Sequence, residues 1–449
     1  MNNTVGFVSL GCCKNLVDAE RILTLLTVNG YRTAASAEEA DVVVINTCGF
    51  INPSIDESFE AIQEMLDLGK QIIITGCLGK RADFIREHFP SDLICGITGP
   101  HSYDEVFSLI TQILPPGRKR LICHADAPCP GIKLTPPHYA YLKISEGCSN
   151  KCTFCAIPYL RGPMISRNIA DVMQEADLLL ERGVRELLVV AQDTLDYGRD
   201  LNFAPGTYQG RSHETSFMAL LDFLSRKDAW IRLHYLYPYP LIRKIIPYLR
   251  DSAVVPYLDI PLQHSSPSVL RRMRRPGNTE RMLEEILSWK EQIPDLCIRS
   301  SFIVGFPGET EEDFQGLLDF IRNARLERVG CFPYSSVWGV QANDLPDQVP
   351  PEVRQERHDR FMEVQQEISV QLLREKIGRT LEVIADSYDQ EEETLICRTR
   401  YDSPEIDGCL YISCAPEEGQ SRIGTVFPAK VTGSDEYDLY GEFADQAPV

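Results

Sequence analysis

The feature that most restricts the fold of this chain is a regular alternation of short apolar runs with helical segments. Apolar runs occupy residues 5–10, 42–45 and 72–74, and apolar residues at helical spacing fill 15–29 and 53–68 between them. The runs predict buried strands and the intervening segments predict helices. Because strand and helix alternate, we expect a parallel sheet with right-handed crossovers. The prediction is an N-terminal α/β domain over about residues 3–115.

The same alternation continues in the middle of the chain, after a Pro- and Gly-rich stretch at 115–137 that predicts a linker. Strand candidates recur at residues 139–144, 185–190, 231–235, 257–261, 298–304 and 330–333. A full barrel of eight strand–helix units takes about 250 residues. Residues 134–372 therefore predict a complete or partial TIM-like barrel. A charged helix over about 351–378 is expected to act as a connector.

The C-terminal segment, about residues 375–443, has a different pattern. Short strand-like stretches separated by turns predict a small antiparallel β-barrel. From residue 376 onward the chain carries 6 Lys and Arg against 16 Asp and Glu. Such an acidic barrel disfavours binding to nucleic-acid phosphates, and a basic protein is the better electrostatic partner.

The composition of the whole chain narrows the class of protein further. The 449 residues carry a formal net charge of −20 at pH 7, which opposes non-specific binding to DNA or RNA. No apolar run approaches the roughly 18 residues of a membrane span, so no membrane partner is expected. The chain starts without a basic, then apolar, leader pattern, and its 15 cysteines are an odd number. We therefore expect a cytoplasmic protein without a disulfide scaffold.

A compact set of cysteines, Cys148, Cys152 and Cys155, directly follows the first predicted strand of the middle segment. Iron–sulfur clusters are held by thiolates, and three thiolates leave one iron of a four-iron cluster open for a small molecule. The loop lies at the carboxyl ends of the strands, where barrels of this type carry their active sites. A structural zinc site is the alternative, but no second cysteine or histidine pair follows at zinc-site spacing.

A dispersed set, Cys12, Cys48 and Cys77, lies in the N-terminal segment. Each cysteine comes one to three residues after a predicted strand, at the edge of a parallel sheet where ligands bind. The three thiols are therefore expected to converge on one crevice. Free cysteines are often buried apolar residues, which is the competing interpretation. Cys13 is a second thiol beside Cys12, and spacing alone does not exclude it as the ligand.

Other strand ends of the predicted barrel bring polar groups to the same face. These candidates for cofactor binding are Gln192, Asp193, Gln263, His264 and Gly305. A structural role is an equal alternative for His264. The acidic residues after Thr310 are more simply the first turn of a helix.

The segment CSNKCTFC, on the first loop of the predicted barrel, resembles the radical S-adenosylmethionine enzymes. The three-part organisation, with a three-cysteine N-terminal domain and a C-terminal TRAM-like barrel, resembles the methylthiotransferases of that superfamily. The stretches SLGCCKNLVDAE, NTCGFI, LVVAQDT, PLQHSS and YDSPEIDG look most like the members that modify ribosomal protein S-twelve. One departure is visible, since the family usually has Pro where this chain has Cys13.

The resemblance implies two 4Fe–4S clusters and S-adenosylmethionine as cofactors. Cys148, Cys152 and Cys155 would hold the radical cluster, and Cys12, Cys48 and Cys77 the auxiliary cluster, with these ligands as the catalytic residues. Phe154 matches the position that flanks the adenine of the bound cofactor. The implied reaction adds a methylthio group to the β-carbon of an aspartate of S-twelve, free or within the 30S subunit. An external reductant and a sulfur donor are implied as partners.

Two alternatives to this function remain. The sister reaction in the same family modifies an isopentenylated adenosine of tRNA, and a basic C-terminal barrel would have favoured it. A non-catalytic electron carrier with two clusters is the second, although a pure carrier has no reason to leave irons open.

Overall fold

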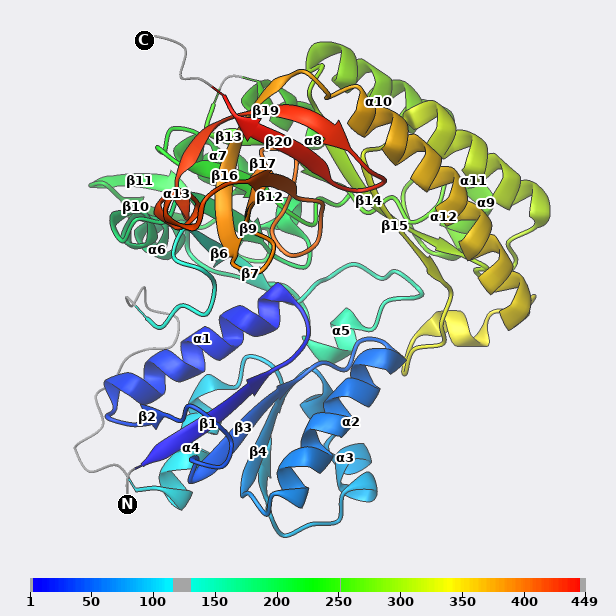
Figure 1. The fold of residues 1–449 in the computed structure, drawn as a ribbon. Coiled ribbons are helices and arrows are strands. Elements are labelled where there is room, and N and C mark those ends of the chain that lie inside the picture. The colour runs from blue at the N-terminus through cyan, green and yellow to red at the C-terminus, as the bar shows by residue number, and fades with distance from the viewer. Residues whose placement is uncertain (1–2, 116–130, 251, 445–449) are drawn as a thin grey trace.

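The computed structural model describes residues 3–115, 131–250 and 252–444, which form three large sheets and two small two-stranded ones (Figure 1). An N-terminal parallel sheet lies below an open central sheet in this view, and a small closed barrel lies in front of the central sheet. Most of the predicted linker, residues 116–130, is outside the described residues. The α/β class and the three kinds of sheet are as predicted, while the predicted domain limits stay predictions.

The N-terminal sheet has five parallel strands in the order β2-β1-β3-β4-β5. The strands are β1 Thr4–Ser9, β2 Arg32–Thr33, β3 Val42–Thr47, β4 Ile72–Gly76 and β5 Ile94–Ile97. The three predicted strands are β1, β3 and β4, in the centre of the sheet. The edge strands β2 and β5 were not predicted, because each is short and lacks a long apolar run.

Helices cover both faces of this sheet, as parallel strands buried on two sides require. They are α1 Cys13–Val28, α2 Asn52–Asp67, the 3-10 helix η1 Leu78–Arg81, α3 Ala82–His88 and α4 Tyr103–Ile113. Apolar residues of α1 and α4 pack with Val42 and Val44 on one face. Those of α2 and α3 pack with Val43 and Ile45 on the other face. Helices α1 and α2 fall within two residues of their predicted limits.

The central sheet has six parallel strands in the order β15-β14-β13-β12-β9-β6, so each crossover leads to the neighbouring strand. The strands are β6 Tyr139–Lys143, β9 Glu186–Val190, β12 Trp230–Leu233, β13 Val254–Asp259, β14 Cys297–Val304 and β15 Arg328–Pro333. All six were predicted. Among the described residues β15 and β6 do not pair, so the barrel is partial.

Helices cover the outer face of the central sheet and bury the largest apolar core of the protein. They are α6 Ile169–Glu181, α7 Phe217–Leu224, α8 Ile242–Ile245, α10 Thr279–Gln292, α11 Glu311–Ala324 and α12 Pro351–Arg374. Two short helices, α5 Ile157–Leu160 and α9 Pro267–Arg272, pack instead in a smaller apolar cluster with Cys77 and Phe306. Shorter elements are η2 Thr194–Asp196, η3 Ile246–Leu249, η4 Gln341–Asp344 and the hairpins β7 Ser145–Glu146 with β8 Ile165–Ser166 and β10 Pro205–Tyr208 with β11 Arg211–Glu214.

Two of these helices bear on predictions from the sequence. Helix α11 begins with a capping box, in which Thr310 and Asp313 exchange side-chain to backbone hydrogen bonds, so its acidic first turn is a helix start as expected. Helix α12 is more than a connector, because Phe361 and Ile368 are buried in the central core.

The C-terminal barrel is closed in the order β16-β17-β18-β20-β19. Its strands are β16 Thr380–Asp389, β17 Thr394–Thr399, β18 Leu410–Ser413, β19 Val426–Ser434 and β20 Leu439–Phe443, with helix α13 Pro416–Arg422 between β18 and β19. The predicted small barrel is confirmed, but it is not wholly antiparallel. Strands β18 and β20 pair in parallel, since α13 and β19 intervene and return the chain in the same direction.

The turn that follows β17 is buried against the central sheet. Asp402 accepts a hydrogen bond from Arg328 Nε at 3.1 Å, and Tyr257 Oη donates to Asp407 at 2.6 Å. Ser403 Oγ lies 3.2 Å from His234 Nε2. The YDSPEIDG stretch thus fastens the barrel to the central sheet. No helix of the described part of the chain is both long and apolar enough to cross a membrane.

Candidate functional site

The compact cysteine set lies in the loop after β6 and the β7 hairpin strand, at the carboxyl-end edge of the central sheet. Cys148 N donates to Gly162 O at 3.1 Å, and Cys155 N donates to Cys152 O at 3.2 Å, which folds the loop into a tight turn. Cys148 is buried, whereas Cys152 and Cys155 are partly exposed. The loop therefore offers three free thiols at an open edge, as predicted.

The dispersed set is brought together at the corresponding edge of the N-terminal sheet. Cys12 follows β1, Cys48 follows β3 and Cys77 follows β4, and all three thiols are free. Gly11, with φ of +87°, lies so close to Cys48 that a Cβ would be 3.1 Å from its Sγ. Asn15 bridges the first two loops, since its Nδ2 donates to Leu10 O at 2.9 Å and Thr47 O at 3.0 Å.

One buried arginine joins the two cysteine sets. Arg161, from the end of the compact loop, donates from Nε to Cys77 Sγ at 3.3 Å. Its Nη1 pairs with Glu146 at 2.7 Å and with Asp18 of α1 at 3.2 Å. Lys143 at the end of β6 pairs with the same two carboxylates. This balanced network of two cations and two anions fixes the N-terminal sheet against the central sheet.

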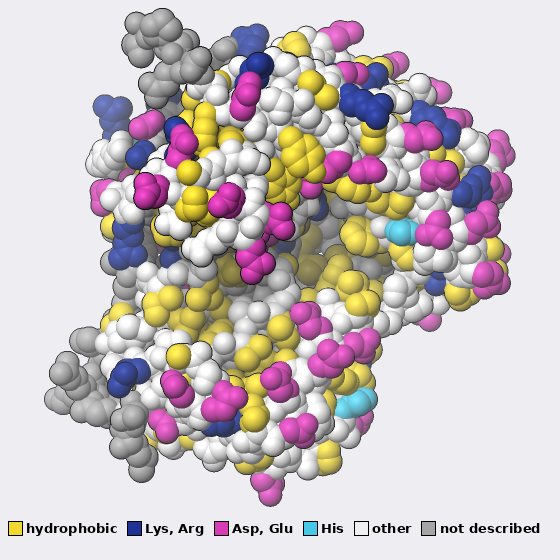
Figure 2. All heavy atoms as spheres, in the orientation of Figure 1, with side chains coloured by type: hydrophobic (Ala, Val, Ile, Leu, Met, Phe, Trp, Pro, Cys, Tyr) yellow, Lys and Arg dark blue, Asp and Glu magenta, His cyan; other side chains and the backbone are white. Residues whose placement is uncertain are grey.

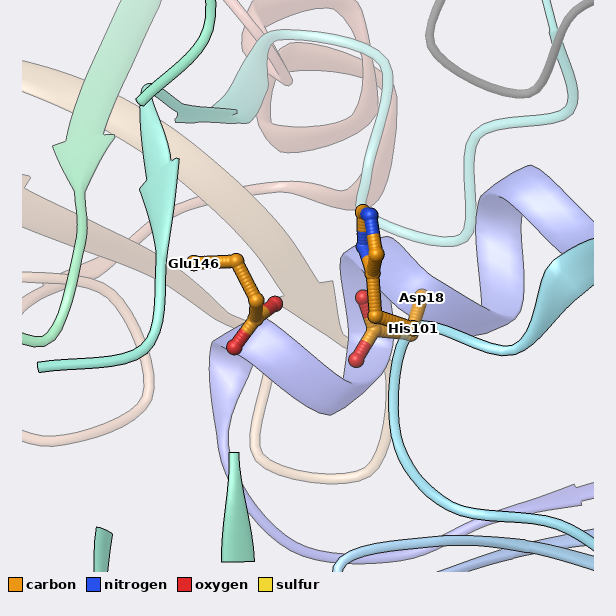
Figure 3. A group of neighbouring side chains, drawn as sticks. All are labelled: Asp18, His101 and Glu146. Atoms are coloured by element: carbon orange, nitrogen blue, oxygen red, sulfur yellow. The ribbon is translucent and has the colours of Figure 1, made fainter. Parts of the chain in front are cut away.

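Asp18, His101 and Glu146 place ligand atoms within 4.8 Å of one another, the one such group among the described residues (Figure 3). The figure shows both carboxylates near the start of α1, with the imidazole beside Asp18. Because Lys143 and Arg161 already bind these carboxylates, their proximity has an explanation that requires no metal ion.

The number of thiols in each set bears on which metal group the set could hold. A structural zinc site takes four Cys or His ligands that converge on one ion. In the described part of the chain each set has three cysteines, and neither belongs to a close group of ligand atoms with a further Cys, His, Asp or Glu. Three thiolates are the number that leaves one iron of a four-iron cluster open. The two donor sets therefore fit such clusters.

The charges around the thiols differ between Cys12 and Cys13. The Cys12 side chain reaches solvent, but protein atoms packed around its thiol would by themselves raise its pKa; the positive charges of Lys14 and Arg161 outweigh this and lower the pKa. Burial raises the pKa of Cys13, whose Sγ lies 3.6 Å from Tyr235 Oη. Because a metal ligand must be deprotonated, Cys12 suits ligation better than Cys13.

A segment of three tyrosines after β12 forms a wall that reaches Cys152 of the compact set and Cys13, the neighbour of Cys12 in the dispersed set. Tyr235 Oη lies by Cys13, Tyr237 Oη lies 3.9 Å from Cys152 Sγ, and Tyr239 Oη donates to Asp193 at 2.8 Å. Each of the first two rings carries a cation. Lys14 Nζ is 3.2 Å from the centre of the Tyr235 ring, and the Arg275 guanidinium is 4.0 Å from that of Tyr237.

Of the other predicted contacts, Phe154, Gln192 and Asp193 lie beside the cysteine loop. Phe154 packs edge-on against Phe306, with 6.4 Å between ring centres. Gln192 Nε2 donates to Glu146 at 2.8 Å. Asp193 is buried and accepts from Asn150 of the loop at 2.7 Å, and burial raises the pKa of its carboxyl to about 6.

The remaining predicted residues have structural contacts. His264 is buried, accepts at Nδ1 from Ser266 N at 2.9 Å, and faces Glu309 at 3.5 Å. Gln263 has φ of +74°, and its backbone pairs with β14. Gly305 has φ of +69°, and a Cβ there would be 2.4 Å from Arg354 Cγ of α12. A role of these three residues in cofactor binding stays a prediction.

Sequence reasoning missed Arg161, Lys14 and the three tyrosines. The tyrosines had a usable signal, because Tyr235 ends the strand predicted at 231–235 and Tyr237 and Tyr239 directly follow it, at the carboxyl-end edge. Arg161 and Lys14 had none, since their partners lie far away in the sequence.

Family models match the chain in three parts. Residues 4–96 match the Uncharacterized protein family UPF0004, residues 142–321 match the Radical SAM superfamily, and residues 377–444 match the TRAM domain. The Ribosomal protein uS12 methylthiotransferase RimO of Salmonella paratyphi A is 51% identical over 437 residues, which is 97% of either chain. The chain belongs to the RimO family. The Proteus mirabilis protein of the same name is also 51% identical, over 98% of both chains.

Among solved structures, the radical S-adenosylmethionine methyltransferase TsrM of Kitasatospora setae is similar, with a TM-score of 0.52. It is 15% identical, with 73% of this chain and 72% of that one covered, so the likeness concerns the fold alone. Membership of the RimO family makes this chain a radical S-adenosylmethionine methylthiotransferase, and the prediction of enzyme class from the sequence is confirmed. The predicted cofactors, 4Fe–4S clusters and S-adenosylmethionine, accord with that class.

Proposed function

We propose that this protein adds a methylthio group to the β-carbon of an aspartate of ribosomal protein uS12. It uses two 4Fe–4S clusters and two molecules of S-adenosylmethionine. The RimO relatives, named for action on uS12, support this substrate over tRNA. The observation that carries the proposal is the placement of two three-thiol sets at facing sheet edges, joined by Arg161 and by the tyrosine wall.

Each cysteine set has its own task in this proposal. Cys148, Cys152 and Cys155 hold the radical cluster, and Cys12, Cys48 and Cys77 hold the auxiliary cluster. With S-adenosylmethionine and an electron from the external reductant, the group held by the first set would supply a 5′-deoxyadenosyl radical. The group held by the second set would supply sulfur, with a second S-adenosylmethionine as the source of the methyl group.

The rest of the site positions the reactants and excludes water. A β-carbon next to a carboxylate carries no proton that a side chain removes at neutral pH, so acid–base catalysis does not serve this step. Phe154, Phe306 and Tyr334 pack in an apolar cluster that includes buried Cys77, and this cluster keeps bulk water from the reacting groups. The tyrosine wall holds the two edges in one geometry, as a reaction that consumes a transient radical requires.

Charge also favours a protein over tRNA as the substrate. The net charge of −20 and the acidic C-terminal barrel repel a phosphate backbone and attract a basic ribosomal protein. A ribosomal substrate, free or in the 30S subunit, places the enzyme in the cytoplasm. The reaction further requires an external reductant and a sulfur donor that rebuilds the auxiliary cluster.

A competition between substrates tests this function. The anaerobically reconstituted enzyme, with S-adenosylmethionine, sulfide and reductant, would receive uS12 and isopentenylated tRNA together. Mass spectrometry of both products should find a methylthio group on one aspartate of uS12 and unmodified tRNA. The Cys152→Ala variant serves as the control, with neither product expected. A methylthio group on the tRNA adenosine would refute the proposed substrate.

A further inference from the structure

Lys14 lies at the first turn of α1, two residues after Cys12, and its side chain is buried, with 7% of its surface exposed. Its ammonium lies on the face of the Tyr235 ring, 3.2 Å from the ring centre. Its polar neighbours are the Tyr235 hydroxyl and the thiols of Cys12 and Cys13. Among the ion pairs of the described residues none joins Lys14 to a carboxylate, whereas nearby Lys143 and Arg161 are paired with Asp18. An ammonium has three N–H donors, so it can bind an anion in addition to these neighbours.

The other cations near Lys14 have different partners. Arg161, Lys143 and Arg167 each pair with buried or half-buried carboxylates. Arg275 lies on the other side of the wall, with Nη1 4.0 Å from Cys152 Sγ. Lys14 is thus a buried cation beside Cys12 that, among the described residues, forms no ion pair with a carboxylate, whereas the unpaired Lys80 near Cys77 is exposed.

Exposed surface lies next to this position. Cys12, beside Lys14, is exposed although it lies where the N-terminal and central sheets meet. Figure 2 shows the molecule hollowed between these two parts, with hydrophobic side chains gathered around the hollow. In Figure 1 the start of α1 borders the same region. An extended peptide entering there brings a side chain to Lys14 past mostly apolar surface.

We propose that Lys14 binds the carboxylate of the acceptor aspartate and thereby selects an acidic side chain. This inference rests on the proposed function and adds the residue that recognises the substrate. The β-carbon is bonded to the carboxylate carbon, so an anchored carboxylate presents that carbon to the space between the cysteine sets. A neutral nucleobase, such as the adenine of tRNA, offers no anion to the buried ammonium of Lys14, which would then stay unpaired. Tyr235 limits the directions that the Lys14 side chain takes.

The test is a cycle of enzyme and substrate variants. Binding of uS12 and of uS12 with the acceptor Asp replaced by Asn is measured by calorimetry on the anaerobically reconstituted enzyme. Wild-type enzyme should prefer the aspartate form by about 10- to 100-fold, as a charge-assisted hydrogen bond out of bulk water gives. Lys14→Met should reduce this ratio to near one, and Lys14→Arg, which keeps the charge, should retain part of it.

Lys80→Met is the matched control, because it removes a positive charge three residues after Cys77 from an exposed position. It should keep the wild-type preference. Iron content of every variant is measured as well. If Lys14→Met lost iron but kept the wild-type preference, Lys14 would serve the cluster and the inference would be refuted. Absence of methylthio transfer to uS12 by wild-type enzyme would refute the proposed function itself, and that result is distinct.

Discussion

Replacement of Arg161 by Met tests the role of the buried network between the two cysteine sets. The side chains of Arg161, Asp18 and Glu146 are 1%, 4% and 5% exposed. In the native protein these two carboxylates are balanced by Arg161 and Lys143. Arg161→Met leaves one buried carboxylate without a cation. Removing one partner of a buried pair costs about 3 to 5 kcal/mol, because the remaining charge is desolvated and unpaired.

The free energy of unfolding is measured by urea denaturation of the reduced protein without clusters. Arg226→Met is the control, since Asp222 of α7 and Arg226, two residues after the end of this helix, form an exposed pair that contributes less than about 1 kcal/mol. The double variant Arg161→Met with Glu146→Gln restores the charge balance and should recover part of the loss. A loss in Arg161→Met no larger than that of the control would refute the reasoning.

The same prediction has a pH dependence. Burial alone would raise the pKa of Glu146, but Lys143 and Arg161 hold it well below its usual range. Because the pKa of Glu146 is lower in the folded than in the unfolded protein, its carboxylate stabilises the fold above the unfolded-state pKa, near pH 4. This contribution to stability is lost as the pH falls. The difference in unfolding free energy between wild type and Arg161→Met should therefore be greatest at neutral pH and shrink below about pH 4.

Three further predictions concern single residues. Because the pKa of Asp193 is raised to about 6 in the fold, the unfolding free energy of the wild type should fall by about 2 kcal/mol relative to Asp193→Asn as the pH rises from 4 to 6. Denaturation at each pH measures this, and parallel profiles would contradict it. Iron analysis should show that Cys12→Ser loses about half of the bound iron and that Cys13→Ser loses none. If Cys13→Ser lost the iron and Cys12→Ser kept it, Cys13 would be the ligand. Gly305→Ala should destabilise the protein by about 1 to 3 kcal/mol, because φ is +69° and Arg354 fills the Cβ position; an unchanged melting temperature would contradict this.

The local sequence pattern predicted the helices and strands well, but it predicted contacts between residues far apart in the sequence poorly. The six central strands were found because each is an apolar run between helical segments. Cys12, Cys48 and Cys77 were placed together because the strands before them are parallel and share an edge. Both inferences use only neighbouring residues and a topological rule.

The contacts that the sequence did not predict depend on which segments, far apart in the sequence, pack together in the fold. Arg161 contacts Asp18 across 143 positions of sequence, and no periodicity encodes that pair. The parallel pairing of β18 with β20 depends on closure of the barrel and not on either strand alone. YDSPEIDG was informative as a resemblance, but its role in fastening the barrel through Asp402 became visible only with the central sheet in place.

The division of labour between the two cysteine sets is the central claim, and one measurement tests it most directly. Wild type, Cys48→Ala and Cys152→Ala would be incubated with S-adenosylmethionine, reductant and uS12 deuterated at the acceptor β-carbon. The account predicts that Cys48→Ala still forms deuterated 5′-deoxyadenosine but no methylthio product, and that Cys152→Ala forms neither. Methylthio product from Cys48→Ala, or 5′-deoxyadenosine from Cys152→Ala, would contradict it.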